Sequence, residues 1–191
     1  MSIVKLLASD EVPSEVRELF RRVEAEYGFV PNILKAMAHC PELVTTFVPF
    51  WGTVYRSPTI GSKLRALSAL GTASAQKCEY CMAHMTVSAR RAGYSPDQIA
   101  AVGPGHRMTE LFDEREAAVV EYADALTLHP KEVPGELKTK LRKLFSDAEL
   151  VNITVAVALY NLTSRFLNGL EVDVEALFEG ARPAATSVSS T

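Results

Sequence analysis

The sequence predicts an all-α protein: a compact multi-helix bundle with a CxxC cysteine pair at the start of a core helix. Apolar residues recur at spacings of three and four along most of the chain, and no alternating strand pattern competes with this spacing. Proline and glycine fall where helices should start and stop. Nearly half of the 191 residues are apolar, so we expect one domain over residues 1–182. Residues 183–191 have nothing to bury and are expected to form a disordered tail.

Four helices are expected before the cysteine pair. The first has Ser14 as its cap and stops at Gly28, and the second starts with Pro31. Pro41 opens the third, which Pro49 should kink or divide. The fourth, "GSKLRALSALGTASAQ", is apolar or small on most faces, as is typical of a helix buried inside a bundle. These expected helices span 12–28, 30–40, 41–57 and 61–76.

The second half of the chain continues the helical pattern. The helix that carries the CxxC pair should stop at Gly93, and the next has Ser95 as its cap and Pro96 at its first position. The last begins with a capping box, Ser146 and Glu149, and stays apolar for several turns, which favours a buried helix. These expected helices span 78–93, 95–103, 113–130, 134–145 and 146–170.

Composition and charge exclude several classes of function. The net charge is −3 with scattered Lys and Arg, so we expect neither a nucleic-acid partner nor a membrane partner. No uninterrupted apolar run approaches the roughly 20 residues of a membrane span. The N-terminus lacks the features of a signal peptide, so a cytoplasmic location is expected. In a reducing compartment a close cysteine pair points to redox, catalytic or metal chemistry.

The stretch "KCEYCMAHM" carries the chemistry. On a helix Cys81 lies about 60° from Cys78, so the two sulfurs share a face; Met85 completes that face, and His84 lies at its edge, nearer Cys81. Amide groups at a helix start stabilise a thiolate, and the second sulfur can resolve a sulfenic acid. His84 is the nearest candidate base. The competing interpretation is that the pair is two small buried apolar side chains.

A metal site is not expected. A structural zinc ion needs four ligands, and the pair with His84 supplies three. Cys40 and His39 could join only through folding. His106 and His129 are expected to be a solvated loop residue and a helix-end residue.

The chain resembles the alkylhydroperoxidase D / carboxymuconolactone decarboxylase superfamily, and in particular its peroxidase-related branch. Three stretches carry the resemblance: "EYGFVPNILKAMAHCPEL", "KLRALSALGTASAQKCEYCMAHMTVSARRAG" and "ALYNLTSRFLNGL". It implies an all-α fold, homo-oligomers with active sites near subunit contacts, and reduction by an external dithiol such as a lipoyl group, with no tightly bound cofactor. It also implies that Cys81 attacks peroxide and Cys78 forms the disulfide.

Two positions depart from the family pattern. The relay histidine of the family falls at Met85 and its relay glutamate at Ala66, and neither side chain can move a proton. His84 is then a substitute base. Peroxidase activity is therefore weakened, or the fold serves different chemistry. One alternative is a non-redox decarboxylase, lyase or isomerase acting on a small carboxylated or aromatic substrate, and another is a non-enzymatic scaffold.

Three further residues are candidates for substrate binding. Tyr80, between the cysteines, can donate a hydrogen bond to substrate or serve packing, and Trp51 can line a pocket or pack in the core. Arg165 lies in a long apolar helix, where an unpaired charge is costly. We expect it to form a buried ion pair with Asp124 or Glu121, or to bind a substrate carboxylate. The substrate class that these residues predict is a hydroperoxide or a small organic acid.

Overall fold

The computed structural model describes residues 2–103 and 110–178, and all regular elements within these ranges are helices. The predicted all-α class is therefore confirmed. The expected tail, residues 183–191, and the expected loop residue His106 lie outside the described ranges. The elements are α1 (Ser14–Tyr27), α2 (Asn32–Met37), α3 (Pro41–Tyr55), α4 (Gly61–Ala75), α5 (Glu79–Arg91), α6 (Pro96–Ala101), α7 (Glu114–Leu128), α8 (Gly135–Leu144), α9 (Asp147–Gly169) and the 3-10 turn η2 (Ala176–Phe178).

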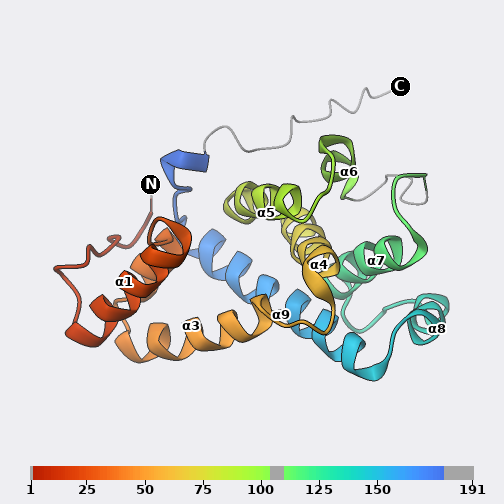
Figure 1. Ribbon diagram of the computed structural model, residues 1–191, viewed down its shortest axis with the longest axis horizontal. Coiled ribbons are helices and arrows are strands. Elements are labelled where there is room, and N and C mark those ends of the chain that lie inside the picture. Colours follow the sequence, from red (N-terminus) through yellow and green to blue (C-terminus); the bar gives the residue numbers. More distant parts are fainter. Residues whose placement is uncertain (1, 104–109, 179–191) are drawn as a thin grey trace.

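Helix α4 lies at the centre of the bundle, packed against α5, α7 and α9 (Figure 1). All eight residues from Ala66 to Ala73 are buried, as predicted for this helix. Small side chains permit the close packing. A Cβ atom added at Gly71 would lie 3.1 Å from the Cβ of Ala123 in α7, tighter than most such contacts. The small-residue pattern of the sequence thus becomes the helix around which the other layers are arranged.

Polar caps fix several helix starts. The hydroxyl of Ser95 accepts a hydrogen bond from the Gln98 amide, and Ser146 does the same for Glu149, so both predicted caps are confirmed. A third capping box, Asp113 with Glu116, opens α7.

One expectation about the first helices is wrong, and of the two effects expected of Pro49 the division of the helix is not found. Ser14 is the first residue of α1 rather than its cap; Pro13 holds the cap position and makes no side-chain bond there. Helix α3 is not divided, because it continues past Pro49 to Tyr55. The stop at Gly28 is confirmed, since Gly28 takes the left-handed conformation with φ of 85°.

Two left-handed turns without glycine shape the region around the cysteines. Lys77 (φ 51°) ends α4, and Glu171 (φ 50°) ends α9. In both, the amide of the following residue bonds back into the last turn: Cys78 to the Ala73 carbonyl and Val172 to the Leu167 carbonyl, each 3.0 Å. These are Schellman closures, in which glycine is the usual residue. The first turn delivers Cys78 directly to the start of α5.

Helix α9 is both a core helix and a surface helix. It is the one helix of the described ranges that is long and apolar enough to cross a membrane, by length and composition, and 44% of its most apolar window is buried inside the bundle. Its inner face carries Ile153, Tyr160, Ser164 and Leu167. Val151 and Leu162 point outward and are 61% and 51% exposed.

Candidate active site

The two cysteines are reduced and lie at the start of α5. Cys78 is the N-cap residue, and its sulfur accepts a hydrogen bond from the Cys81 amide at 3.3 Å. The Cys81 sulfur accepts a hydrogen bond from the Ser164 hydroxyl of α9, also at 3.3 Å. Cys78 is completely buried, and Cys81 is 4% exposed. The pair is thus held by both the helix terminus and a neighbouring helix.

The negative charge of the pair is favoured on Cys78. Hydrogen bonds from the Cys81 thiol and amide lower the pKa of the Cys78 thiol to about 7, although burial acts in the opposite direction. The hydrogen bond to Cys78, burial and the adjacent charge raise the pKa of the Cys81 thiol far above its usual range, despite Ser164 and Thr163. One thiolate and one thiol therefore share the site near neutral pH.

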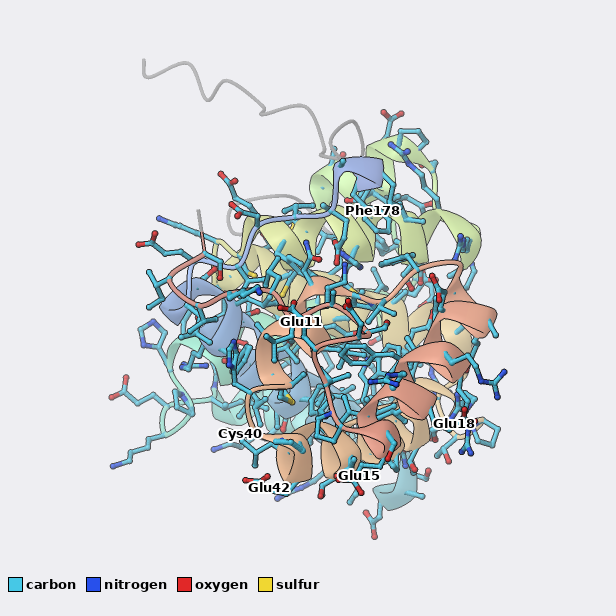
Figure 2. All side chains as sticks on the ribbon, turned by 90° about the vertical axis from the view of Figure 1, so that its left-hand side faces the viewer. Glu11, Glu15, Glu18, Cys40, Glu42 and Phe178 are labelled. Atoms are coloured by element: carbon cyan, nitrogen blue, oxygen red, sulfur yellow. The ribbon has the colours of Figure 1, made fainter. Side chains whose placement is uncertain are left out.

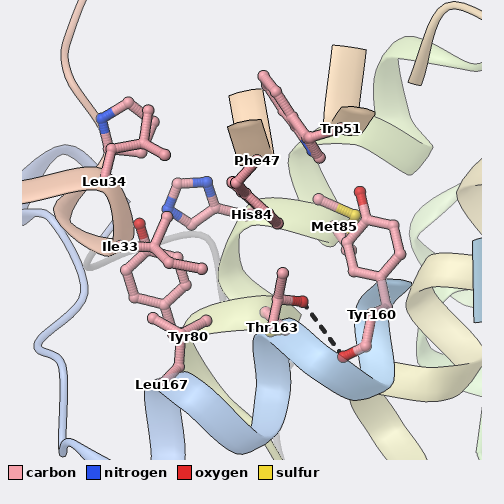
Figure 3. Close-up of a pocket in the computed structure, with 12 residues that line it drawn as sticks. Ile33, Leu34, Phe47, Trp51, Tyr80, His84, Met85, Tyr160, Thr163 and Leu167 are labelled. Atoms are coloured by element: carbon pink, nitrogen blue, oxygen red, sulfur yellow. Dashed lines mark hydrogen bonds between the residues drawn. The ribbon is translucent and has the colours of Figure 1, made fainter. Parts of the chain in front are cut away.

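Cys81, and not Cys78, faces a pocket. The pocket has a volume of about 80 Å³ and an almost wholly apolar wall, and side chains from α2, α3, α5 and α9 surround it (Figure 3). The residues that line it are Pro31, Ile33, Leu34, Phe47, Trp51, Tyr80, Cys81, His84, Met85, Tyr160, Thr163 and Leu167. The sulfur with access to a small molecule is therefore the one that holds its proton more tightly.

His84 is held against this pocket by aromatic stacking and by a carboxylate. Its ring stacks on Tyr80 with centroids 4.4 Å apart and an interplanar angle of 12°, and Phe178 covers it at 4.1 Å. Its Nε2 lies 2.6 Å from Oε2 of Glu175. Since a carboxylate only accepts hydrogen bonds, Nε2 carries a proton, and Nδ1 is the nitrogen left free to accept one.

Glu175 is a site residue that the sequence patterns did not indicate. It follows α9 in the segment 171–178 and is only 8% exposed. Its Oε1 accepts hydrogen bonds from the Tyr80 hydroxyl and from the backbone amide of Asn32, each 2.6 Å long. Burial acts to raise the pKa of Glu175, but the bonds from His84, Tyr80 and Asn32 outweigh it and lower the pKa below its usual value. Glu175 is therefore a carboxylate at neutral pH.

No signal in the sequence connects Glu175 with His84. The two residues are 91 positions apart, and the segment 171–178 has no helical periodicity. The one available hint is that two acidic residues, Asp173 and Glu175, lie among apolar ones in "VDVEALF". Only the turn at Glu171, which folds this segment back over α5, brings the carboxylate to the imidazole.

The structure places the other predicted substrate-binding residues in different surroundings. Trp51 and Tyr80 line the pocket, but the Tyr80 hydroxyl is engaged by Glu175. The two departures from the family pattern are also visible. Met85 is part of the pocket wall, whereas Ala66 is buried within α4.

The expected environment of Arg165 is wrong. Its side chain is exposed and lies outside the pocket wall, and it donates hydrogen bonds to the side chain and the carbonyl of Asn161. The buried positions of this part of α9 are spaced three and four apart, and 165 falls on the opposite face. Neither suggested partner binds it: Glu121 pairs with Lys140 instead. Among the residues that line the pocket there is no lysine or arginine.

The remaining thiol and metal candidates lie away from this site. Cys40 is exposed at the start of α3, well separated from Phe178 in Figure 2. His39 bonds to the Lys5 carbonyl at 2.9 Å. Within residues 2–103 and 110–178, no three His, Cys, Asp or Glu side chains gather as a metal site would require.

Comparisons with known proteins agree with this fold. Residues 41–125 match the model of the carboxymuconolactone decarboxylase family. The uncharacterized protein YnjA of Escherichia coli K12 is 30% identical over 154 residues, which cover 79% of this chain and 83% of YnjA.

Solved structures share the architecture at lower identity. An uncharacterized peroxidase-related protein from Silicibacter sp. TM1040 has a TM-score of 0.82 and 22% identity, covering 94% of each chain. A cysteine-to-alanine variant of the debrominase Bmp8, in complex with 2,3,4-tribromopyrrole, has a TM-score of 0.81 and 22% identity, covering 95% of this chain and 97% of Bmp8. An uncharacterized peroxidase-related protein from Ralstonia eutropha JMP134, described as an alkylhydroperoxidase AhpD core, has a TM-score of 0.79 and 21% identity, covering 93% of this chain and 94% of that one.

The bundle around α4 and the cysteine pair that opens α5 agree with the sequence and structural matches, and the chain belongs to the alkylhydroperoxidase D-like / carboxymuconolactone decarboxylase superfamily.

Proposed function

We propose that the protein is a thiol-dependent peroxidase that reduces small, uncharged organic hydroperoxides through Cys81 and Cys78. The observation that carries this proposal is that the two sulfurs have different surroundings. Cys81 opens onto an apolar pocket, and Cys78 holds a thiolate directly behind it. A nucleophile with access and a resolving thiolate within reach are the two requirements of this chemistry.

The steps balance with the groups at hand. His84 takes the proton of the Cys81 thiol at Nδ1, and the Cys81 thiolate attacks the terminal oxygen of ROOH. The O–O bond breaks, Cys81 becomes a sulfenic acid, and the alkoxide takes the proton back from His84 and leaves as ROH. The Cys78 thiolate then attacks the Cys81 sulfur and expels hydroxide, which is protonated to water. The product is a Cys78–Cys81 disulfide.

An external dithiol completes the cycle. A lipoyl-type dithiol reduces the disulfide by thiol exchange and is itself oxidised to a disulfide, so the proposal needs no tightly bound cofactor.

The size and polarity of the pocket support this substrate class. Its volume of about 80 Å³ is roughly half that of an engineered apolar cavity that holds benzene, so a short alkyl group fits better than a long chain. A carboxylated substrate is disfavoured because the lining offers no lysine or arginine to pair with it. This weighs against a decarboxylase acting on a small organic acid.

Variants of Cys81 and His84, together with the pH dependence of disulfide formation, test the proposal. With tert-butyl hydroperoxide and dihydrolipoamide, Cys81→Ser should abolish turnover, and His84→Ala should slow it by about a hundredfold or more without abolishing it. Because Cys78 must be a thiolate to resolve the intermediate, disulfide formation should slow as the pH falls below about 7. Full activity in Cys81→Ser would overturn the mechanism.

A second candidate is reductive dehalogenation of a small aromatic ring, favoured by the aromatic side chains of Phe47, Trp51 and Tyr160 in the wall. The Cys81 thiolate would take the halogen, the ring carbon would take the proton from His84, and Cys78 would displace halide to form the same disulfide. The small volume of the pocket ranks this candidate second. Bromide release from 2,3,4-tribromopyrrole with dihydrolipoamide, in the absence of hydroperoxide turnover, would reverse the order.

The protein is further proposed to act in the cytoplasm as a homo-oligomer. The exposed apolar side chains of α9, Val151 and Leu162, support a contact between copies, because such side chains gain stability when covered. Leu162→Lys should shift the protein toward monomer in sedimentation velocity, whereas Lys131→Ala on the exposed α7–α8 connection should not. A monomeric wild-type protein would contradict this.

A further inference from the structure

We infer that Glu175 is the positioning residue of this active site: it fixes His84 in the productive tautomer and stabilises its charged form, in place of the relay that Ala66 and Met85 cannot provide. The inference rests on the proposed role of His84 beside Cys81. It assigns the function of the relay carboxylate to the segment 171–178, which follows α9 and is far from Ala66 and Met85 in the sequence.

Glu175 fixes the tautomer of His84. Glu175 accepts at both oxygens: Oε2 from His84, and Oε1 from the Tyr80 hydroxyl and the Asn32 amide, all at 2.6 Å. With three donors around it, the carboxylate has a fixed orientation and remains ionised. Its bond to Nε2 therefore keeps Nδ1 of His84 as the site of proton transfer.

Glu175 also compensates the positive charge that His84 acquires during the reaction. When His84 takes the proton of Cys81, an imidazolium forms in a largely apolar site, where an unpaired charge is costly. Glu175, 8% exposed and in direct contact, compensates that charge. The titratable groups that face His84 are Glu175 from the segment 171–178, Tyr80 and Cys81 from α5, with Cys78 behind them, and Tyr160 across the pocket on α9. Among these, Glu175 is the only one that contacts the imidazole as a carboxylate.

His84 lies one helical turn beyond Cys81, a separation that places their Cβ atoms about 5–6 Å apart on the same side of α5. Both side chains line the same pocket. The tight stack of Tyr80, His84 and Phe178 restricts rotation of the imidazole. Glu175 thus acts through His84 and does not touch the substrate.

The test uses alkylation of Cys81 by iodoacetamide as a function of pH, with the labelled residue located by mass spectrometry. This readout needs no hydroperoxide, so failure of the proposed peroxidase reaction and failure of the inference remain distinguishable. In Glu175→Gln the rate near pH 7 should fall about tenfold, equivalent to a shift of about one pH unit toward alkaline pH. His84→Ala should cause a similar loss, and the double variant should lose no more than either single one.

Glu116→Gln is the matched control. Glu116 is equally buried and also accepts a tyrosine hydroxyl and a backbone amide, but it lies away from the pocket. Its alkylation profile should remain that of the wild type, and Glu175→Asp should recover part of the lost rate. A folded Glu175→Gln protein within twofold of wild type would overturn the inference, as would a double variant whose loss is the product of the single losses.

Nitrogen NMR of His84 keeps the inference testable if Glu175→Gln does not fold. In the wild-type protein, neutral His84 should carry its proton at Nε2 and have Nδ1 unprotonated. Neutral His84 protonated at Nδ1 instead would overturn the inference.

Discussion

Two buried carboxylates in this molecule have nearly the same surroundings but different expected roles. Glu175 accepts hydrogen bonds from the Tyr80 hydroxyl and a backbone amide, and Glu116 accepts them from the Tyr94 hydroxyl and a backbone amide. Each cluster includes a phenylalanine, Phe178 or Phe112, that is 7% exposed. The essential difference is the basic side chain that each carboxylate contacts. Glu175 faces a histidine, whereas Glu116 faces a lysine.

The identity of that partner separates a structural cluster from a reactive one. Lys63 lies 3.6 Å from Glu116 on the surface side and also covers the Tyr94 ring. The cluster therefore serves the start of α7, where Glu116 completes a capping box. His84 is an imidazole, a side chain suited to general acid–base catalysis, and it lines a pocket beside a thiol. Both clusters contain a buried carboxylate. Only in the Glu175 cluster does the carboxylate contact an imidazole that lines a pocket.

The largest expected effect comes from the two phenylalanines. Phe178→Ala and Phe112→Ala should each lower the free energy of unfolding by about 3–5 kcal/mol, because each removes a buried ring. Only Phe178→Ala should also lower peroxidase activity in protein that remains folded, since Phe178 covers His84. Urea unfolding together with turnover at low temperature would measure both quantities. Equal loss of activity in the two variants would erase the distinction between the clusters.

The tyrosine hydroxyls give an intermediate effect. Tyr80→Phe and Tyr94→Phe each leave a buried carboxylate short of one donor, so each should cost about 1–3 kcal/mol of stability. Tyr80→Phe should in addition slow oxidation of Cys81 by hydroperoxide, because it loosens Glu175, while Tyr94→Phe should leave that rate unchanged. Stopped-flow oxidation of the reduced variants would decide, and an unchanged rate in Tyr80→Phe would mean that this hydroxyl serves stability alone.

The smallest effect is expected at Lys63. Its side chain is 57% exposed, and ion pairs of this kind contribute about 0–1 kcal/mol. Lys63→Met should therefore change the midpoint of urea unfolding little and leave turnover and its pH dependence unaltered. A pH profile of peroxide reduction displaced by this variant would show that the Glu116 cluster communicates with the active site.

Sequence patterns predicted the local features of this molecule. The helices, the caps at Ser95 and Ser146, and the placement of the cysteine pair at the start of α5 follow from local periodicity and capping, and all are found in the structure. These features depend on residues within a few positions of each other. Ser14 failed as a cap because the preceding proline occupies that position.

Long-range features could not be predicted in the same way. Arg165 was expected to be buried because its helix is apolar, but the orientation of α9 depends on its packing against α4, and 165 falls on the outer face. Glu175 reaches His84 only because Glu171 turns the chain back over α5. Neither outcome is encoded in a spacing within one helix, so only the folded chain reveals it.

Disulfide mapping after one equivalent of tert-butyl hydroperoxide reacts with the fully reduced protein shows whether Cys81 and Cys78 form a working redox pair. We expect a Cys78–Cys81 disulfide with Cys40 still free and alkylatable, and the same disulfide in a Cys40→Ser variant. Oxidation confined to the exposed Cys40, with Cys78 and Cys81 still reduced, would contradict it.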